Sequence, residues 1–307
     1  MKAVQVKQYG GEEQLQVVEV PRPEVGAKQV LVRVAATSFN PVDPKRVSGA
    51  MRQVFPLQFP FTPGGDFSGV VESVGPEAKS FRVGDEVIGY AMAGGAYAEF
   101  IAVDEDKIAL KPKSVGHVEA ASLALVAQTA SQMLDRVGAE KGKTVLIHGA
   151  GGAVGGAAVQ IAHGRGATVI ATAAAHSVVR VRANGADKVI DYAAEPFEKS
   201  VHDVDAVLDT VGGPVQQRSF EVIKPNGALV AITQPPVAEE AAKHKVNASF
   251  LITEVSRGSL QTVARMIDAG EIKPFVSKVY PLSEVAKAWE AQRLKPAEGK
   301  IVFAVGN

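Results

Sequence analysis

The chain has 307 residues, of which 46% are hydrophobic and 21% charged, and its 33 basic and 33 acidic side chains give a formal net charge of zero. This length and composition are typical of a globular protein with about two domains, and the balanced charge argues against a nucleic-acid partner. The chain has no cysteine, which excludes disulfides, thiolate nucleophiles and zinc sites that use sulfur.

Residues 1–115 consist mostly of short β-branched runs, such as 2–6, 15–20 and 29–39, which glycine and proline separate closely. This pattern predicts a β-rich domain, either a partly open barrel or a sandwich. Residues 1–11 lack the apolar stretch of a secretory signal, and no window of about 18 apolar residues predicts a membrane span. We therefore expect a soluble protein of the cytoplasm with no membrane span.

A different pattern begins at His117. Residues 117–137 predict a buried helix, because they are mostly small and apolar and include no proline or glycine. Strands and helices then alternate, which predicts a doubly wound parallel sheet. The predicted strands are 144–149, 168–173, 188–192, 205–212, 227–233 and 248–253, and the predicted helices are 153–166, 177–185, 214–224 and 259–270.

Residues 273–303 again predict strand, helix and strand, and we expect them to return to the first domain. The predicted fold class is therefore α/β. Residues 1–118 and 272–307 form the β-rich domain, and residues 119–271 form the domain with the parallel sheet.

The segment Thr144–Gly156, TVLIHGAGGAVGG, places five glycines directly after an apolar strand. Its spacing is not GxGxxG, because Val154 stands at the last position, but Gly149, Gly152 and Gly155 fit GxxGxxG. Backbone N–H groups at a helix start favour a phosphate, and strand, glycine turn and helix form the context of dinucleotide binding. The motif alone also fits a tight turn with no ligand, but the repeated strand–helix units favour a dinucleotide.

The residues after the second strand indicate which dinucleotide. An NAD site carries an Asp or Glu about 20 residues after the turn, which binds the ribose 2′-hydroxyl. Here no acidic residue lies between Glu140 and Asp187, and His176, Arg180 and Arg182 lie nearby. The missing carboxylate and the cations suit a 2′-phosphate, so we predict NADPH. The arginines could instead form a solvated helix face.

Several motifs in the same order resemble the medium-chain dehydrogenase/reductase superfamily, and most of all its zinc-free quinone oxidoreductases and alkenal reductases. The resemblance covers essentially the whole chain. It implies a GroES-like N-terminal domain, a doubly wound Rossmann domain and an active site in the cleft between them. The matching segments are SFNPVDPKR (38–46), FTPGGDFSGVVESVG (61–75), FRVGDEVIG (81–89), GAYAEF (95–100), KTVLIHGAGGAVGGAAVQIA (143–162), GADKVIDY (185–192) and GKIVF (299–303).

The resemblance also bears on zinc. Zinc-dependent relatives have a catalytic cysteine where this chain has Asn40, and the sequence GHE where it has Gly64, Gly65 and Asp66. They also insert a four-cysteine lobe that this chain lacks. The six histidines form no spaced ligand pair, so we predict that no metal is bound.

A bound reduced nicotinamide supplies hydride. Without the polarisation that zinc gives a carbonyl, acceptors that delocalise the incoming electrons are favoured. We therefore expect a zinc-independent, NADPH-dependent oxidoreductase that acts on quinones or α,β-unsaturated carbonyls. Two alternatives stay open: a trans-2-enoyl thioester reductase, and a non-catalytic NADPH-binding protein like the lens crystallins of this family.

The predicted catalytic residues are Asn40, Asp43, Lys45 and Tyr97. Asn40 can donate a hydrogen bond to a developing oxyanion or hold the nicotinamide ribose. Asp43 and Lys45 could orient ribose hydroxyls or relay a proton, and Tyr97 could be the general acid. The alternatives are structural: NPVDP is good turn chemistry, and Tyr97 could simply cover a strand face.

The resemblance implies further cofactor contacts. Thr129, Phe250 and Leu251 would contact the nicotinamide, although helix back-bonding or core packing also explains them. Ala174 stands where close relatives carry a serine for the 2′-phosphate, so Ser177 or Arg180 could substitute. The predicted cofactor-binding residues are Thr129, Gly149, Gly151, Gly152, Ala153, Val154, Gly155, Thr172, Ser177, Arg180, Tyr192, Phe250, Leu251 and Lys300, the last of these reaching the phosphates.

Relatives often dimerise by pairing the last strands of their Rossmann domains. Residues 247–253, NASFLIT, are apolar enough to form such an edge. We therefore predict a homodimer.

Overall fold

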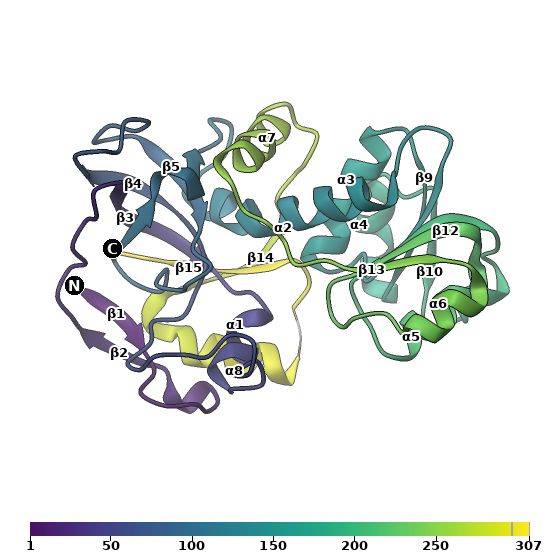
Figure 1. Ribbon diagram of the computed structural model, residues 1–307, viewed down its shortest axis with the longest axis horizontal. Coiled ribbons are helices and arrows are strands. Elements are labelled where there is room, and N and C mark those ends of the chain that lie inside the picture. The colour runs from purple at the N-terminus through teal and green to yellow at the C-terminus, as the bar shows by residue number, and fades with distance from the viewer. Residues whose placement is uncertain (296, 307) are drawn as a thin grey trace. The chain divides into compact units, whose positions relative to one another are not determined.

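The computed structural model describes residues 1–295 and 297–306, and its contacts divide the chain into two units. The first, the mixed-sheet unit, contains Met1–Leu125, Val255–Gly270 and Pro274–Asn307. The second, the parallel-sheet unit, contains Val126–Glu254 and Glu271–Lys273. The C-terminal segment (yellow in Figure 1) returns to the N-terminal strands, where strand β15 pairs with strand β3.

The mixed-sheet unit is built around β3, the longest strand of its sheet. The sheet runs in the order β14-β15-β3-β4-β5-β7, with β6 also paired to β3, and β1 and β2 form a separate antiparallel pair. The strands are β1 (Lys2–Gln5), β2 (Gln16–Glu19), β3 (Gln29–Ser38), β4 (Asp66–Val74), β5 (Glu86–Tyr90), β6 (Phe100–Asp104), β7 (Ile108–Leu110), β14 (Val276–Pro281) and β15 (Lys300–Ala304). The helices are α1 (Val42–Val47), the first part of α2 (His117–Val137), α7 (Arg257–Asp268) and α8 (Val285–Leu294).

Aromatic rings fill the centre of this unit. The Tyr97 ring packs edge-on against Phe303, with the two centroids 5.2 Å apart, and both residues are fully buried. Gly64 makes room for Tyr97, because a Cβ there would lie 2.1 Å from the ring. The same glycine has a φ of +86°, which side chains rarely adopt. The first glycine of the GGD segment therefore serves the packing of Tyr97.

Helix α7 departs from the predicted domain boundary, which placed residues 257–270 with the parallel sheet. In the structure Leu260 of α7 joins a buried cluster with Ile88 and Ala109 of the mixed-sheet unit. The backbone N–H of Ser114 also donates to Asp268 Oδ1 (2.9 Å) at the end of α7. The apolar face of α7 is clear in the sequence, but the surface that it covers is not.

The parallel-sheet unit has six strands in the order β10-β9-β8-β11-β12-β13. All six strands are parallel, but successive strands are added in one direction from β8 to β10 and in the opposite direction from β11 to β13. In open sheets of this kind ligands bind at the carboxyl ends of the strands beside that switch, here β8 and β11. The strands are β8 (Thr144–His148), β9 (Thr168–Ala173), β10 (Lys188–Asp191), β11 (Val204–Asp209), β12 (Ile223–Ala231) and β13 (Asn247–Phe250). The helices are α3 (Ala153–Gly164), α4 (Val178–Ala183), α5 (Pro214–Ser219) and α6 (Ala238–His244).

The predicted fold class, α/β with a β-rich domain and a doubly wound parallel sheet, is confirmed. Short 3₁₀ helices complete the secondary structure at Glu12–Gln14, Glu105–Lys107, Ala175–Ser177, Phe197–Lys199, Phe220–Val222 and Leu282–Glu284. None of the helices in residues 1–295 and 297–306 is both long and apolar enough to cross a membrane.

Candidate functional site

The glycine turn after β8 depends on close backbone approach. Gly149 has a φ of +73°, and a Cβ there would lie 2.4 Å from Thr210 Oγ1. The Gly152 N–H closes the turn by donating to Gly149 O (2.9 Å). A Cβ at Gly155 would lie 2.4 Å from the same Gly149 oxygen. All three glycines of the GxxGxxG spacing therefore lie at the turn, and a side chain at the first or third would meet neighbouring atoms.

Helix α3 starts directly from this turn, with Gly152 as its N-cap. No side chain in the described part of the chain caps it. The first N–H with a partner inside the helix is that of Gly156, which donates to Gly152 O (2.9 Å). The N–H groups of Ala153, Val154 and Gly155 are therefore the orphan donors of the helix start. Such a start, together with the helix dipole, suits a phosphate.

Two predicted residues from the segment after β9 reach the same turn. The guanidinium of Arg180 donates to Gly151 O (2.9 Å). The Ser177 hydroxyl lies so close to Gly151 that a Cβ there would stand 2.8 Å from Ser177 Oγ. The structure thus brings a cation and a hydroxyl together beside the orphan N–H groups.

The nearest acidic residue along the chain lies away from this end of the sheet. Asp187 Oδ2 accepts from the Val169 N–H (2.7 Å) near the start of β9, at the opposite end of that strand from Ser177. The Tyr192 N–H donates to Ala173 O (3.2 Å) at the end of β9, and its ring is 63% exposed. A cation, a hydroxyl and an exposed aromatic ring thus lie near the end of β9, together with Asp191 of β10, which pairs with Ala173 and accepts the Ala193 N–H.

Thr172 has an internal partner that the sequence did not reveal. Its hydroxyl lies 3.0 Å from His148 Nδ1, and His148 Nε2 lies 3.1 Å from Ser219 Oγ. Burial lowers the pKa of His148 to about 3, so the ring is neutral at physiological pH. The geometry therefore gives Thr172 a structural role within the sheet.

Thr129, Phe250 and Leu251 also lie in the parallel-sheet unit. Thr129 Oγ1 is 2.8 Å from Thr253 Oγ1, so the helix residue and the segment after β13 meet. Leu251 is buried, whereas Phe250 is 37% exposed. These three predicted residues are thus grouped, with only Phe250 offering a substantial exposed surface.

A buried polar cluster forms where β3, β4 and β15 of the mixed-sheet unit meet. The Lys300 ammonium donates to Phe39 O (2.6 Å), Asn40 Oδ1 (2.8 Å) and Asp66 Oδ2 (3.0 Å). Asn40 Nδ2 and Ser38 Oγ each donate to Asp66 Oδ2 at 2.8 Å. All three hydrogens of the ammonium are therefore used inside the unit. This finding does not support the predicted contact of Lys300 with a phosphate.

Asp43 and Tyr97 form the second part of the cluster. Asp43 Oδ2 accepts from the Asn40 N–H (2.9 Å) and from the Tyr97 hydroxyl (3.1 Å). Burial raises the pKa of Asp43 from its ordinary 3.8 to about 6, against the opposing effects of the Asn40 N–H and of Lys300. Burial, and then the Asp43 charge, raise the pKa of Tyr97 well above its ordinary value. The Tyr97 hydroxyl therefore stays protonated and donates a hydrogen bond to Asp43.

The structure brings Asn40, Asp43 and Tyr97 together but leaves Lys45 apart. The Lys45 side chain is exposed on α1 and makes no side-chain hydrogen bond or ion pair with any described residue. Ser38 and Asp66 also belong to the cluster, and neither is among the residues predicted from the sequence. The available signal was the aspartate at the start of a strongly apolar strand, since a carboxylate buried there needs partners.

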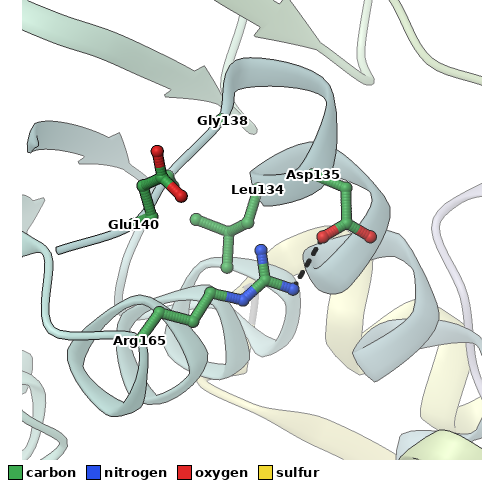
Figure 2. A pocket seen from close by; sticks show the side chains of 6 residues that line it. Leu134, Asp135, Gly138, Glu140 and Arg165 are labelled. Atoms are coloured by element: carbon green, nitrogen blue, oxygen red, sulfur yellow. Dashed lines mark ion pairs between the residues drawn. The ribbon is translucent and has the colours of Figure 1, made fainter.

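A pocket of about 480 Å³ lies elsewhere in the parallel-sheet unit, at the carboxyl end of α2 (Figure 2). The Arg165 guanidinium lies beside Asp135 there, with a 2.8 Å ion pair between them. No predicted site residue lines this pocket, and its arginine is already paired. The lining residues are Leu134, Asp135, Gly138, Ala139, Glu140 and Arg165.

Two family models match the chain. Residues 26–113 match the alcohol dehydrogenase GroES-like domain, and residues 184–303 match a model described as zinc-binding dehydrogenase. Within residues 1–295 and 297–306, however, no three His, Cys, Asp or Glu side chains gather as a metal site would require.

Similar proteins span nearly the whole chain. The chloroplastic NADPH-dependent alkenal/one oxidoreductase of Arabidopsis thaliana is 36% identical, over 98% of this chain and 79% of its own length. The quinone oxidoreductase of Mus musculus is 31% identical, over 94% of this chain and 93% of its own. The solved quinone oxidoreductase of Coxiella burnetii superimposes with a TM-score of 0.94 at 32% identity, over 100% of this chain and 99% of the other.

The raised pKa of Asp43 predicts an unusual effect of pH on stability. Between about pH 6 and 3.8 the folded protein binds the Asp43 proton and the unfolded chain does not, so acidification through that window stabilises the fold. We expect the Asp43 contribution to the free energy of unfolding to rise by about 1.4 kcal/mol from pH 7.5 to pH 5. The isosteric D43N variant, which keeps an oxygen for both donors, should lack this gain.

Urea titrations of both proteins at pH 7.5, 6 and 5 measure the difference. The exposed Asp106 provides the matched control, because D106N should follow the wild type at every pH. Parallel stability curves for wild type and D43N would contradict the assignment.

Proposed function

This chain belongs to the medium-chain dehydrogenase/reductase superfamily, and from that membership we propose that it is an NADPH-dependent oxidoreductase that transfers hydride to quinones or α,β-unsaturated carbonyl compounds. The proposal is supported by relatives named as alkenal/one and quinone oxidoreductases, which are more than 30% identical over nearly the full chain. The observation that carries it in this molecule is the uncapped start of α3 beside Arg180 and Ser177.

The residues of the parallel-sheet unit fit NADPH. The orphan N–H groups of Ala153, Val154 and Gly155 would bind the pyrophosphate. Arg180 would bind the 2′-phosphate, with the Ser177 hydroxyl as a second donor, and both lie within residues 141–186, which include no acidic residue. Bound NADPH supplies the hydride and its electron pair.

The residue chemistry of the mixed-sheet unit suits a conjugated acceptor. The Asp66 carboxylate, at the position of the family's metal-binding segment, is already neutralised by the Lys300 ammonium. Reduction of a quinone or an enone places negative charge on an oxygen through conjugation. A hydrogen-bond donor can stabilise that oxygen, and we assign this role to the Asn40 carboxamide.

We assign proton storage to Asp43. Its pKa of about 6 lets the carboxyl exchange a proton near neutral pH, which suits a general acid or base. Tyr97 is buried and donates to Asp43, so we propose that it orients this carboxyl rather than protonating the acceptor itself. Lys45 is exposed and receives no role in the chemical step.

The proposed activity predicts the order of acceptors in a steady-state assay of NADPH oxidation. We expect turnover with 1,4-benzoquinone, 9,10-phenanthrenequinone or acrolein, and much less with a saturated ketone, which lacks conjugation. We also expect much less with crotonyl-CoA, because the neutral net charge gives no support for a basic surface that would bind its phosphates. Crotonyl-CoA as the best acceptor would instead favour the enoyl thioester reductase. Tight NADPH binding with no turnover of any acceptor would favour a binding protein without catalysis.

The position of Arg180 predicts cofactor selectivity. A hydrogen bond to a charged group contributes about 1.5–3 kcal/mol, so R180A should raise the Kd of NADPH about 10- to 150-fold. The Kd of NADH should change much less. Fluorescence titration with each cofactor measures the ratio.

Arg182 provides the matched control, because it lies exposed on the same helix as Arg180. R182A should bind both cofactors as the wild type does. If R180A raised the Kd of NADPH and of NADH by the same factor, Arg180 would only support the turn through its bond to Gly151 and would not bind the 2′-phosphate.

We further propose a homodimer formed through the edge strand β13, which pairs only with β12 within the described sheet. Phe250 is 37% and Ile252 59% exposed beside this edge, and a bare apolar edge favours pairing with a second copy. The cytoplasm remains our proposed compartment and rests on the sequence alone.

Light scattering at micromolar concentration should give twice the 32.1 kDa mass of one chain. I252K places a charge beside the edge and should yield monomers. V279K, which charges a similarly exposed valine of the mixed-sheet unit, should remain dimeric. A monomeric wild type would refute the dimer.

A further inference from the structure

The carboxamide of Asn40 lies between a buried cation and a buried anion. Its Oδ1 accepts from the Lys300 ammonium (2.8 Å), and its Nδ2 donates to Asp66 Oδ2 (2.8 Å). An ammonium can only donate and a carboxylate can only accept. If the amide were flipped, its NH₂ would face the ammonium and its oxygen would face the carboxylate. The two charges therefore permit one orientation of the amide.

The groups that impose this orientation are themselves held firmly. The other two hydrogens of Lys300 bind Phe39 O (2.6 Å) and Asp66 Oδ2 (3.0 Å). Asp66 Oδ1 accepts the Leu125 N–H of α2 (2.8 Å), and Oδ2 accepts the Ser38 hydroxyl (2.8 Å). The side chains of Lys300 and Asp66 are 6% and 0% exposed, so water does not compete for these bonds.

Within the described residues, Asp66 takes one of the two Nδ2 hydrogens of Asn40, and no partner takes the second. Resting on the proposed function, we propose that Lys300 and Asp66 are positioning residues of the reaction. They hold the Asn40 carboxamide in the orientation that keeps its second N–H available to the oxygen that becomes negative in the acceptor. Lys300 thus acts through Asn40 rather than on the cofactor phosphates.

The matched control for Lys300 is Lys111, a second buried lysine of the mixed-sheet unit. Its side chain is 7% exposed, and its ammonium donates to Pro112 O (2.9 Å) and Val115 O (2.7 Å) and pairs with Glu86 (3.4 Å). K111M therefore removes a comparable buried cation without touching Asn40. Any effect that K300M and K111M share reflects the loss of a buried charge alone.

The first experiment needs neither cofactor nor acceptor. In ¹⁵N-labelled protein the side-chain amide signal of Asn40 is identified by its absence in N40A, and its hydrogen exchange is measured. We expect slow exchange in wild type and K111M, and exchange at least about tenfold faster in K300M, because the amide loses its fixed orientation. Unchanged exchange in K300M would overturn the inference.

If K300M does not fold, the double variant D66N/K300M is measured in its place. It removes both charges and keeps an oxygen acceptor for the Leu125 N–H. It should show the same fast exchange at Asn40, and wild-type exchange in this variant would likewise overturn the inference.

The second experiment is a double-mutant cycle on NADPH oxidation with the best acceptor. Loss of a donor to a developing oxyanion lowers kcat about 10²- to 10³-fold, and we expect N40A to lie in this range. K300M alone should lower kcat about 10- to 100-fold with little change in the KM of NADPH. In the N40A background K300M should cause no further loss, whereas independent, multiplying losses would overturn the proposal.

The two experiments separate the two proposals. If the wild type turns over no acceptor, the proposed function fails, and the amide exchange still decides whether Lys300 and Asp66 hold Asn40. If turnover is normal but K300M matches K111M in both exchange and kcat, the proposed function stands and the positioning role of Lys300 falls.

Discussion

The candidate cofactor site of the parallel-sheet unit depends on the unpaired N–H groups at the start of helix α3. Three backbone N–H groups there have no acceptor within the helix, and no described side chain caps them. The turn that presents them requires a positive φ at Gly149 and the absence of a Cβ at Gly155. Such donors, left unpaired, are costly unless water or a ligand satisfies them. The neighbouring Arg180 and Ser177 then make a phosphorylated ligand the partner that best matches the local charge.

The mixed-sheet unit buries charged side chains in its core. An ammonium and two carboxylates lie within its core, and each is tolerable only because other groups bind it. Lys300 neutralises Asp66, whereas Asp43 bonds to no cation among residues 1–295 and 297–306, and burial raises its pKa to about 6. Lys300 and Asp66 thus form an ion pair, and the Asp43 carboxyl can change its protonation near neutral pH. Asn40 bonds to both parts of the cluster, because its carboxamide contacts Lys300 and Asp66 and its backbone N–H donates to Asp43.

The sequence predicts those parts of the fold that depend on residues close to one another in the chain. The alternation of strands and helices predicts the doubly wound sheet, and the spacing of Gly149, Gly152 and Gly155 predicts the turn, because strand, turn and helix are adjacent in the chain. The missing acid after the second strand and the nearby cations indicate Arg180, and the family resemblance adds Ser177; both lie against the turn. The cofactor roles of these residues remain proposals.

Features that depend on distant pairing could not be predicted. A lysine near the end of a chain resembles a surface lysine, and only the pairing of β15 with β3 and of β3 with β4 brings Lys300 to Asp66. Tyr97 is likewise a buried partner of Asp43, although the two residues are 54 positions apart in the chain. Helix α7 has a clear apolar face, but its sequence cannot reveal that Leu260 packs in the mixed-sheet unit.

The most direct test of the central claim is a crystal structure of the protein with bound NADPH. We expect pyrophosphate oxygens within hydrogen-bond distance of the N–H groups at the start of α3, with the 2′-phosphate against Arg180. An empty glycine turn with NADPH bound elsewhere, or a 2′-phosphate that contacts only solvent, would contradict it.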